Sequence, residues 1–291
     1  MTRAAVDELL VRCRFPSAGT SAVCAVSGGA DSLALLVLAC AAGCDVTAIH
    51  VDHGLREHSA TEADVVAAAA QRFGARFEAR RVTVPAGPNV EARARAARYR
   101  VLPSDVLTGH TADDQAETVL LNLVRGAGLD GLRGMPVARR PIIGVRRADT
   151  RALCAALGLE PVHDPTNDDL SLRRNRVRHE LLPLLDAIAA RDVVPIVARQ
   201  AELLSDDAAF LDALSEVIDP TDAKALTAAP VALARRAIRN WLRCGSGAEH
   251  HPPDAATVER VLAVARGEAK ASDVGGGRRV VRSRGRLTIN P

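Results

Sequence analysis

Apolar positions in the first 135 residues alternate between short continuous runs and longer helical patterns. Ser21–Val26 has the apolar character of a buried parallel strand and stops at a glycine-containing loop before the helical pattern Leu33–Ala42. This order is then repeated by the predicted strands Val46–Val51, Arg76–Val84 and Asp105–Thr108, which alternate with the predicted helices Ala60–Phe73, Val90–Arg100 and Asp113–Arg125. The alternation predicts an α/β fold with a doubly wound, Rossmann-like parallel sheet.

The pattern changes after Pro183. Ala- and Leu-rich helical segments are expected at Val193–Leu214, Val231–Leu242 and Ala255–Arg266, with a break rich in Gly, His and Pro at Gly245–Pro253. Arg278–Arg284 and Arg286–Ile289 then predict a C-terminal β-hairpin, with arginines on one side. We therefore expect an α/β domain over residues 1–186 and a smaller, mainly helical domain with a hairpin over residues 187–291.

Polar loops follow three of the predicted strands. They are Ser27–Ser32 after the first strand, His50–Gly54 after the second and Gly109–Asp114 after the fourth. Because ligands of doubly wound sheets bind at the carboxyl ends of the strands, we expect these loops to converge on one site.

Composition restricts the chemistry of that site. Aromatic residues make up 2% of the chain, which argues against a base-stacking platform. The basic residues are 36 Arg and two Lys, at positions 224 and 270, so a Walker A lysine or a Schiff-base lysine is excluded from the first three quarters of the chain.

Net charge is +3 and uneven, with 14 Arg against 15 Asp and Glu in residues 1–135 and the basic excess in the second half. The densest basic runs, Arg173–Arg178 and Arg278–Arg286, suit phosphate contact or a solvated face. The six cysteines form no C-x-x-C pair, the N-terminus has no secretory signal, and the longest apolar run, Leu33–Ala42, is ten residues. These features predict a reduced cytoplasmic protein that does not enter a membrane.

The loop Ser27–Ser32 reads S-G-G-A-D-S. Gly28 and Gly29 allow backbone N–H groups to point at an anion, the following helix adds its positive end, and Ser27 and Ser32 add hydroxyl donors. Taken alone, the sequence also fits a tight turn with an N-cap. Between a strand and a helix, it resembles the pyrophosphate loop of the N-type ATP pyrophosphatases, known as the PP-loop.

His110, Asp113, Asp114 and Glu117 are spaced i, i+3, i+4 and i+7, which places them on one face of the predicted helix. Their clustered carboxylates require a cation, for which Mg²⁺ and a substrate ammonium are the candidates. The alternative is that these acids complement the helix dipole.

Longer strings resemble one family, the tRNA(Ile)-lysidine synthetases. They are Leu107–Thr118, Arg125–Leu132, Asp164–Asn167 and Arg174–Pro183, together with the S-G-G-A-D-S loop, His50–Arg56 and Glu91–Tyr99. The match covers about residues 20–185. One departure is that nine residues separate Tyr99 from Gly109, where the family has a longer helix, so we expect a truncated helix there.

The resemblance implies an ATP- and Mg²⁺-dependent ligation of free lysine to C2 of the wobble cytidine in the CAU anticodon of tRNA(Ile), through an adenylated tRNA. It also implies the following site residues. ATP would contact Ser27, Gly28, Gly29, Ala30, Asp31, Ser32, His50 and Asp52; Asp31, His110, Asp113 and Arg98 would be catalytic, with Asp31 also holding Mg²⁺; Asp114 and Glu117 would bind lysine; and Arg125, Arg133, Arg174, Arg176, Arg178, Arg279 and Arg282 would bind tRNA.

Several alternatives stay open. His110 or a carboxylate could accept the proton of the lysine amine. An amphipathic helix over Leu181–Leu185 competes with tRNA binding by the neighbouring arginines, and the C-terminal segment also fits a homodimer interface or simple packing. Another PP-loop enzyme, such as a tRNA 2-thiolation enzyme, is disfavoured because there is no C-x-x-C pair, and Cys154 reads as a core residue.

Overall fold

A computed structural model of the chain describes residues 2–52, 54, 59–83, 87, 90–244 and 253–291. The chain divides into two compact units, Met1–Leu203 and Leu204–Pro291. Several features named above lie outside the described residues: His53, Leu55 and Arg56 of the string His50–Arg56, Val84 at the end of the third expected strand, and residues 245–252 of the expected break.

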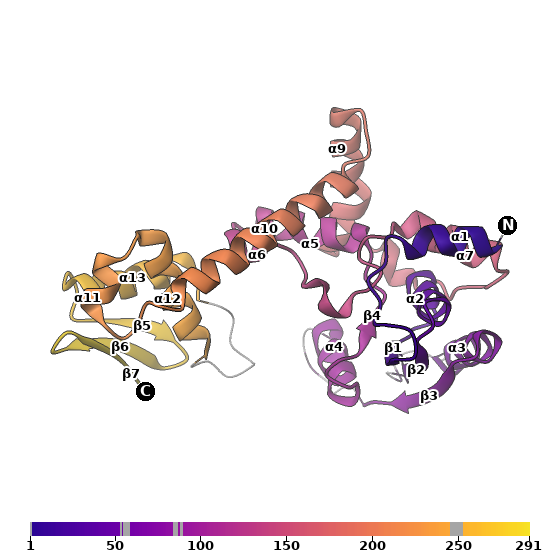
Figure 1. Ribbon diagram of the computed structural model, residues 1–291, viewed down its shortest axis with the longest axis horizontal. Coiled ribbons are helices and arrows are strands. Elements are labelled where there is room, and N and C mark those ends of the chain that lie inside the picture. Colours follow the sequence, from indigo (N-terminus) through magenta and orange to yellow (C-terminus); the bar gives the residue numbers. More distant parts are fainter. Residues whose placement is uncertain (1, 53, 55–58, 84–86, 88–89, 245–252) are drawn as a thin grey trace. The chain divides into compact units, whose positions relative to one another are not determined.

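The first unit contains an open sheet with helices around it (Figure 1). Its elements are α1 Thr2–Leu10, β1 Ser21–Ala25, α2 Ala30–Ala41, β2 Asp45–Asp52, α3 Ser59–Phe73, β3 Arg76–Arg81, α4 Val90–Val101, β4 Leu107–Thr108, α5 Ala112–Val124, α6 Leu129–Leu132, α7 Arg147–Ala156, α8 Arg173–Arg176 and α9 Leu182–Ala189, with 3₁₀ turns at Val137–Arg139 and Pro165–Asp168 and a π-helical turn at Val177–Leu181. The division between the units falls within the long helix α10 Val194–Ser215, which begins in the first unit and ends in the second. None of the helices within the described residues is both long and apolar enough to cross a bilayer.

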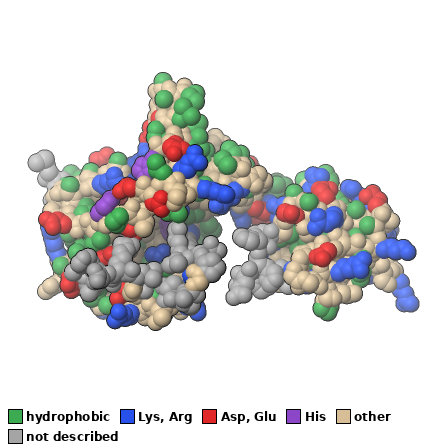
Figure 2. Space-filling model, turned by 180° about the vertical axis from the view of Figure 1, so that it is seen from behind, with side chains coloured by type: hydrophobic (Ala, Val, Ile, Leu, Met, Phe, Trp, Pro, Cys, Tyr) green, Lys and Arg blue, Asp and Glu red, His purple; other side chains and the backbone are tan. Residues whose placement is uncertain are grey.

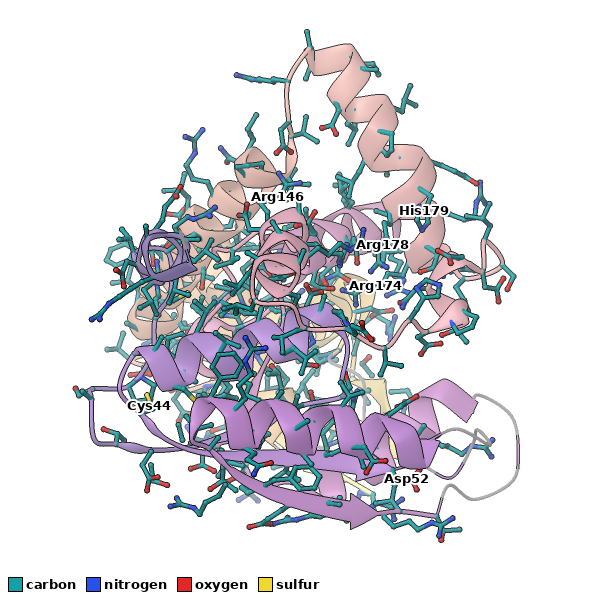
Figure 3. All side chains as sticks on the ribbon, turned by 90° about the vertical axis from the view of Figure 1, so that its right-hand side faces the viewer. Cys44, Asp52, Arg146, Arg174, Arg178 and His179 are labelled. Carbon is teal, nitrogen blue, oxygen red and sulfur yellow. The ribbon has the colours of Figure 1, made fainter. Side chains whose placement is uncertain are left out.

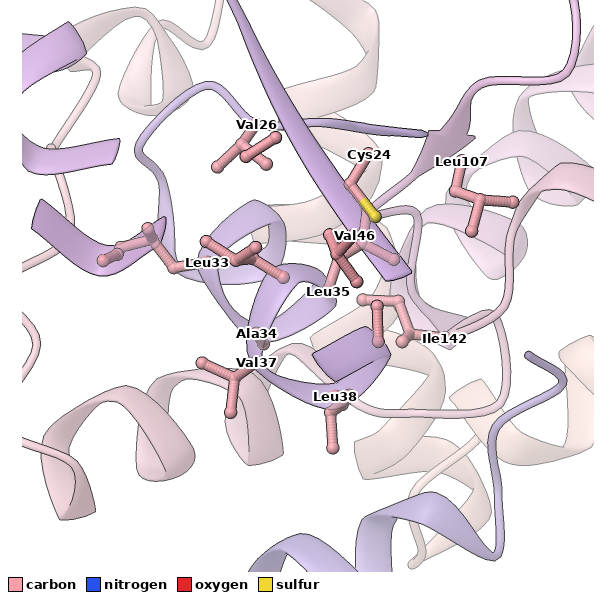
Figure 4. Packing of buried hydrophobic residues seen from close by; sticks show 14 of the residues in the cluster. Cys24, Val26, Leu33, Ala34, Leu35, Val37, Leu38, Val46, Leu107 and Ile142 are labelled. Atoms are coloured by element: carbon pink, nitrogen blue, oxygen red, sulfur yellow. The ribbon is translucent and has the colours of Figure 1, made fainter. Parts of the chain in front are cut away.

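The sheet has the order β3-β2-β1-β4, and every neighbouring pair is parallel. This arrangement confirms the predicted α/β fold. Residues of β1 alternate between its two faces: Ala22 and Cys24 belong to the main core, while Val23 and Ala25 pack with the cluster on the other face. Side chains of α2, among them Leu33 and other fully buried leucines, fill the main core beside β1 and β2 (Figure 4).

The fourth strand is shorter than predicted, with two residues in β4 instead of the expected Asp105–Thr108. Helix α4 ends at Val101, and β4 pairs with β1 through Leu107 and Thr108. The strand is short, yet it directs the next loop toward the start of α2.

The second unit contains α11 Ala223–Ala228, α12 Val231–Cys244, α13 Ala255–Arg266, β5 Ala271–Gly275, β6 Arg278–Ser283 and β7 Arg286–Asn290. Its sheet is antiparallel with the order β5-β6-β7, so the expected hairpin is present and is extended by a third strand. We missed β5 because its sequence, A-S-D-V-G, has no apolar alternation. Val280 and Leu287 of the sheet are buried with Ile238 of α12 and Leu262 of α13.

Gly109, directly after β4, lies against the backbone of α2. A Cβ atom built at Gly109 would stand 2.7 Å from the carbonyl oxygen of Asp31 and 3.1 Å from Cα of Ser32. The loop after β4 can therefore approach the loop after β1 because residue 109 has no side chain.

We predict that Gly109→Ala destabilises the protein by about 2 kcal/mol, because the added methyl group overpacks against rigid backbone. Gly128→Ala is a matched control, since a Cβ there meets nothing within 4 Å and its φ is −79°. Urea denaturation of both variants checks the prediction. Equal stability of the two variants would contradict it.

Candidate active site

The loop Ser27–Ser32 is closed by its own hydroxyl groups. The backbone N–H of Ser27 donates to Oγ of Ser32 (3.1 Å), and that hydroxyl donates to the carbonyl of Gly29 (2.8 Å). Gly28 has φ = 88°, and its carbonyl accepts from the N–H of Val162 (3.0 Å). Helix α2 begins next to this loop, with Gly29 as N-cap and no capping side chain, so its first N–H groups suit an anionic ligand.

Helix α5 begins after Thr111, which forms a capping box with Asp114. Oδ2 of Asp114 accepts from the backbone N–H (2.8 Å) and the hydroxyl (2.9 Å) of Thr111. His110 precedes the helix, and its Nδ1 lies 2.8 Å from the hydroxyl of Thr108. Asp114 thus performs the capping role we considered as the alternative, while its other oxygen, Oδ1, faces a guanidinium group.

That guanidinium belongs to Arg147, the first residue of α7. It donates to Oδ1 of Asp114 (2.9 Å) and Oε1 of Glu117 (2.9 Å), and its Nε lies 3.4 Å from Oδ2 of Asp31. The backbone N–H of Arg147 donates to Oδ2 of Asp113 (2.7 Å). One residue therefore contacts four carboxylates from two helices.

Glu117 is fully buried (0% exposed) and is bound by two further arginines. Nε of Arg174 and Nε of Arg178 each lie 2.7 Å from its carboxylate oxygens. The two arginines lie close together in Figure 3. They stand just before and within the π-helical turn Val177–Leu181, which is followed by Pro183, a residue without a backbone N–H. Arg174 also donates to Oδ1 of Asp114 (2.8 Å).

The carboxylates are thus neutralised by the chain itself. Arg146 donates to both oxygens of Asp113 (3.0 and 3.1 Å), and it also pairs with Asp192. We expected Mg²⁺ or a substrate ammonium to supply the required cation; in the structure arginines do so.

The carboxylates of the site differ in the direction of their pKa shifts. Burial raises the pKa of Asp31, and repulsion by the charge of Asp114 raises it further. The hydrogen bond from Thr150 lowers this pKa but does not outweigh burial. Burial also acts to raise the pKa values of Asp113 and Asp114, but arginine contacts outweigh it and both pKa values lie below their usual range. The pKa of Arg147 is raised by its carboxylate neighbours despite burial, so it stays charged.

Two of the expected ATP contacts, His50 and Asp52, lie on β2. His50 is inside the sheet (1% exposed), with Nδ1 3.0 Å from the carbonyl of Val26. Asp52, at the end of β2, accepts from the N–H of Gly54 (2.7 Å) and lies well away from the two labelled arginines of the Glu117 cluster in Figure 3. Arg98 lies on α4 with its guanidinium 5.9 Å from the centroid of the Tyr99 ring.

The arginines expected to bind tRNA fall into two groups. Arg174 and Arg178 are turned inward onto Glu117, as described above. Arg125, Arg176, Arg279 and Arg282 are exposed and Arg133 is half-buried, while Arg176 also pairs with Glu180. The alternative of an amphipathic helix over Leu181–Leu185 is also supported, because Leu182, with Leu181 and Leu185, packs against apolar residues of α5 and α10.

Sequence reasoning missed Arg146, Arg147 and Thr150. A signal was present: two arginines follow the mainly apolar segment P-I-I-G-V at 141–145 and stand at the start of a helix, where a cation opposes the helix dipole. Partly buried arginines in that position are stabilised by carboxylate partners.

Cys154 is confirmed as a core residue. It is buried, and burial together with the charge of Asp31 raises its pKa to about 11, so its thiol stays protonated near neutral pH. Among the described residues, no three His, Cys, Asp or Glu side chains are grouped so that they could hold a metal ion.

Comparison with known proteins shows the family to which the chain belongs. Residues 4–185 match the model of the PP-loop domain, and residues 222–288 match the model of the TilS substrate binding domain. The chain is 44% identical to the tRNA(Ile)-lysidine synthase of Nocardia farcinica, over 99% of this chain and 97% of that protein. It is 42% identical to the enzyme of the same name from Rhodococcus jostii, over 91% and 88% of the two chains.

A solved structure shares the fold. It is the U34-tRNA thiolase NcsA from Methanococcus maripaludis with its [4Fe-4S] cluster, which aligns with a TM-score of 0.55 and 17% identity over 70% of this chain and 80% of that one. At this identity the likeness concerns the fold alone.

The opposite pKa shifts of Asp31 and Asp114 predict opposite effects on stability. A carboxyl whose pKa is raised by folding lowers stability when ionised at pH 7, whereas one whose pKa is lowered adds stability above its unfolded pKa. Asp31→Asn is therefore expected to raise stability at pH 7 by about 1 kcal/mol. Asp114→Asn, its matched control, is expected to lower stability by about 3 kcal/mol, because Arg147 and Arg174 lose a partner.

Thermal and urea denaturation of both variants at pH 7 measure these changes. Shifts of the same sign in the two variants would refute this account of the site.

Proposed function

Because the chain belongs to the tRNA(Ile)-lysidine synthase family, we propose that it joins free lysine to C2 of the wobble cytidine in the CAU anticodon of tRNA(Ile). The product, lysidine, pairs with A instead of G and so changes the codon read from AUG to AUA. The observation that carries the proposal is the charge-balanced carboxylate cluster of Asp31, Asp114 and Glu117 beside the uncapped start of α2.

The first step is adenylation. O2 of the cytidine attacks the α-phosphorus of ATP, the bond to the β-phosphate oxygen breaks, and pyrophosphate leaves. The loop N–H groups from Gly28 to Ala30 and the hydroxyls of Ser27 and Ser32 are proposed to hold the leaving pyrophosphate.

Mg²⁺ would neutralise phosphate charge when bound, and Asp31 is proposed to hold it. Mg²⁺ in nucleotide sites takes one or two carboxylates and completes its shell with phosphates and water, so a single Asp next to the phosphate loop fits. Asp31 is 26% exposed, and its Oδ1 accepts from Thr150. This leaves the carboxylate oriented but not fully enclosed.

In the second step the lysine amine attacks C2, and AMP leaves. Asp114 and Glu117 are proposed to hold lysine, and His110 and the carboxylates are the candidates for accepting the amine proton. Three guanidinium groups already occupy Glu117, so an ammonium must replace one of them. Arg174, whose side chain is the most exposed of the three at 37%, is the one proposed to give way.

Four exposed arginines and the half-buried Arg133 are proposed to contact the tRNA. Arg125, Arg133 and Arg176 of the first unit, and Arg279 and Arg282 of the second, suit contacts to phosphates, which position RNA without reading its sequence.

The decisive experiment supplies ATP, Mg²⁺ and labelled lysine with a tRNA(Ile) transcript carrying CAU. We expect label on this transcript and none on a control transcript with U at the wobble position. ATP-dependent AMP formation with a different acceptor, and no label on the CAU transcript, would retain the nucleotide site and exclude this substrate.

Partial reactions separate the residue roles. Asp31→Asn is expected to lower tRNA-dependent ATP–pyrophosphate exchange by at least about 100-fold, because an amide cannot neutralise or orient the phosphates as a carboxylate with Mg²⁺ does. Glu117→Gln is expected to raise the KM for lysine by about 10-fold, the effect of one lost charge-assisted contact. Unchanged exchange in the first variant, or an unchanged KM in the second, would overturn the corresponding role.

A further inference from the structure

The turn that joins β6 and β7 has an unfavourable residue at its tip. Ser283 pairs with Arg286, so Arg284 and Gly285 form a two-residue loop. Both have positive φ, 49° and 79°, as a type I′ turn requires. Gly285 adopts this conformation freely and Asn is the favoured first residue, but an arginine there carries a Cβ and pays a steric penalty.

Neighbouring backbone contacts hold this turn in place. The carbonyl of Gly285 accepts from the N–H of Ala223 (3.0 Å), and the N–H of Leu287 donates to the carbonyl of Thr221 (2.7 Å). The turn is therefore fixed to the segment that begins α11. Arg284 is consequently presented from a rigid support.

Within the second unit, Arg284 has no internal electrostatic role. The adjacent Arg286 pairs with Oδ2 of Asp219 (2.8 Å). Arg284 is exposed, and it makes no hydrogen bond or ion pair with any residue that the structure describes. Arginine and lysine side chains project from the surface of this unit in Figure 2, and Arg279 and Arg282 of β6 are exposed as well.

A strained position with an unpaired charge calls for a reason outside the folded chain. We propose that Arg284 contacts a phosphate of the bound tRNA and that the left-handed backbone at this residue fixes its guanidinium at the tip of the β6–β7 turn. The inference rests on the proposed function. A guanidinium matches phosphate geometry with two parallel hydrogen bonds, and a fixed support lowers the entropy lost on binding.

The variant Arg284→Asn tests both halves of the proposal, because stability and binding should move in opposite directions. Asn relieves the backbone penalty, so Tm is expected to rise by about 2–5 °C. Loss of the phosphate contact is expected to raise the Kd for the CAU transcript about 5-fold or more and to reduce the slope of log K against log salt by about 1. Fluorescence anisotropy at several salt concentrations gives both quantities for the full chain.

Two controls separate this contact from general charge effects. Arg284→Lys keeps a cation on the same backbone, so Tm should stay unchanged and the salt slope should be preserved, with weaker binding from the loss of the planar fork. Lys270→Gln removes one exposed cation from the same unit at a position outside the turn, and it is expected to leave the salt slope unchanged.

Each outcome is decisive. A higher Tm for Arg284→Asn with unchanged Kd and salt slope would show that Arg284 serves something other than RNA and would overturn the contact. An unchanged or lower Tm would overturn the strain at this residue. If the unmodified protein binds no tRNA, the proposed function fails and this inference fails with it, a result distinct from binding that Arg284→Asn leaves intact.

Discussion

The structure of the site depends on one buried guanidinium that faces several carboxylates. Arg147 binds Asp31 of α2 and both Asp114 and Glu117 of α5, while its backbone N–H binds Asp113. Each carboxylate would be costly to bury alone, and the arginine would be equally costly without them. Their mutual neutralisation allows the start of α7, the loop after β1 and the start of α5 to lie against one another.

This balance has a consequence for catalysis. The chain is an ATP-dependent ligase of the PP-loop class, and such an enzyme must receive strongly anionic phosphates close to acidic side chains. Because arginines already neutralise Asp113, Asp114 and Glu117, a phosphate bound beside α2, as we propose, would not meet a large uncompensated negative field. Asp31, with a raised pKa and a partly exposed carboxylate, is the least compensated of the four and belongs to the loop Ser27–Ser32 that we propose as the phosphate site.

In the second unit, a count of basic residues alone overstates the charge that is available to a partner, because some arginines are paired with acidic residues of the same unit. Arg236 donates to both oxygens of Asp212 and is buried, and Arg286 is paired with Asp219. These arginines hold α10, α12 and β7 within their own unit. Arg279 and Arg284, by contrast, are exposed and form no ion pair with a described residue, so they are the kind of cation we propose for contact with RNA.

The amino-acid sequence by itself determined the alternation of strands and helices from β1 to α5 and the loops at the strand ends. Apolar periodicity and glycine-containing loops are local signals, so they could be read from segments such as Ser21–Val26. Strand β5 was not predicted, because its few apolar residues do not alternate with polar ones. Only the tertiary structure decided which cation meets which carboxylate: Arg147 is 30 residues from Glu117 and 116 from Asp31, and Arg174 is 57 from Glu117. A run of arginines looks the same whether it faces RNA or a buried carboxylate, and packing of distant segments makes that choice.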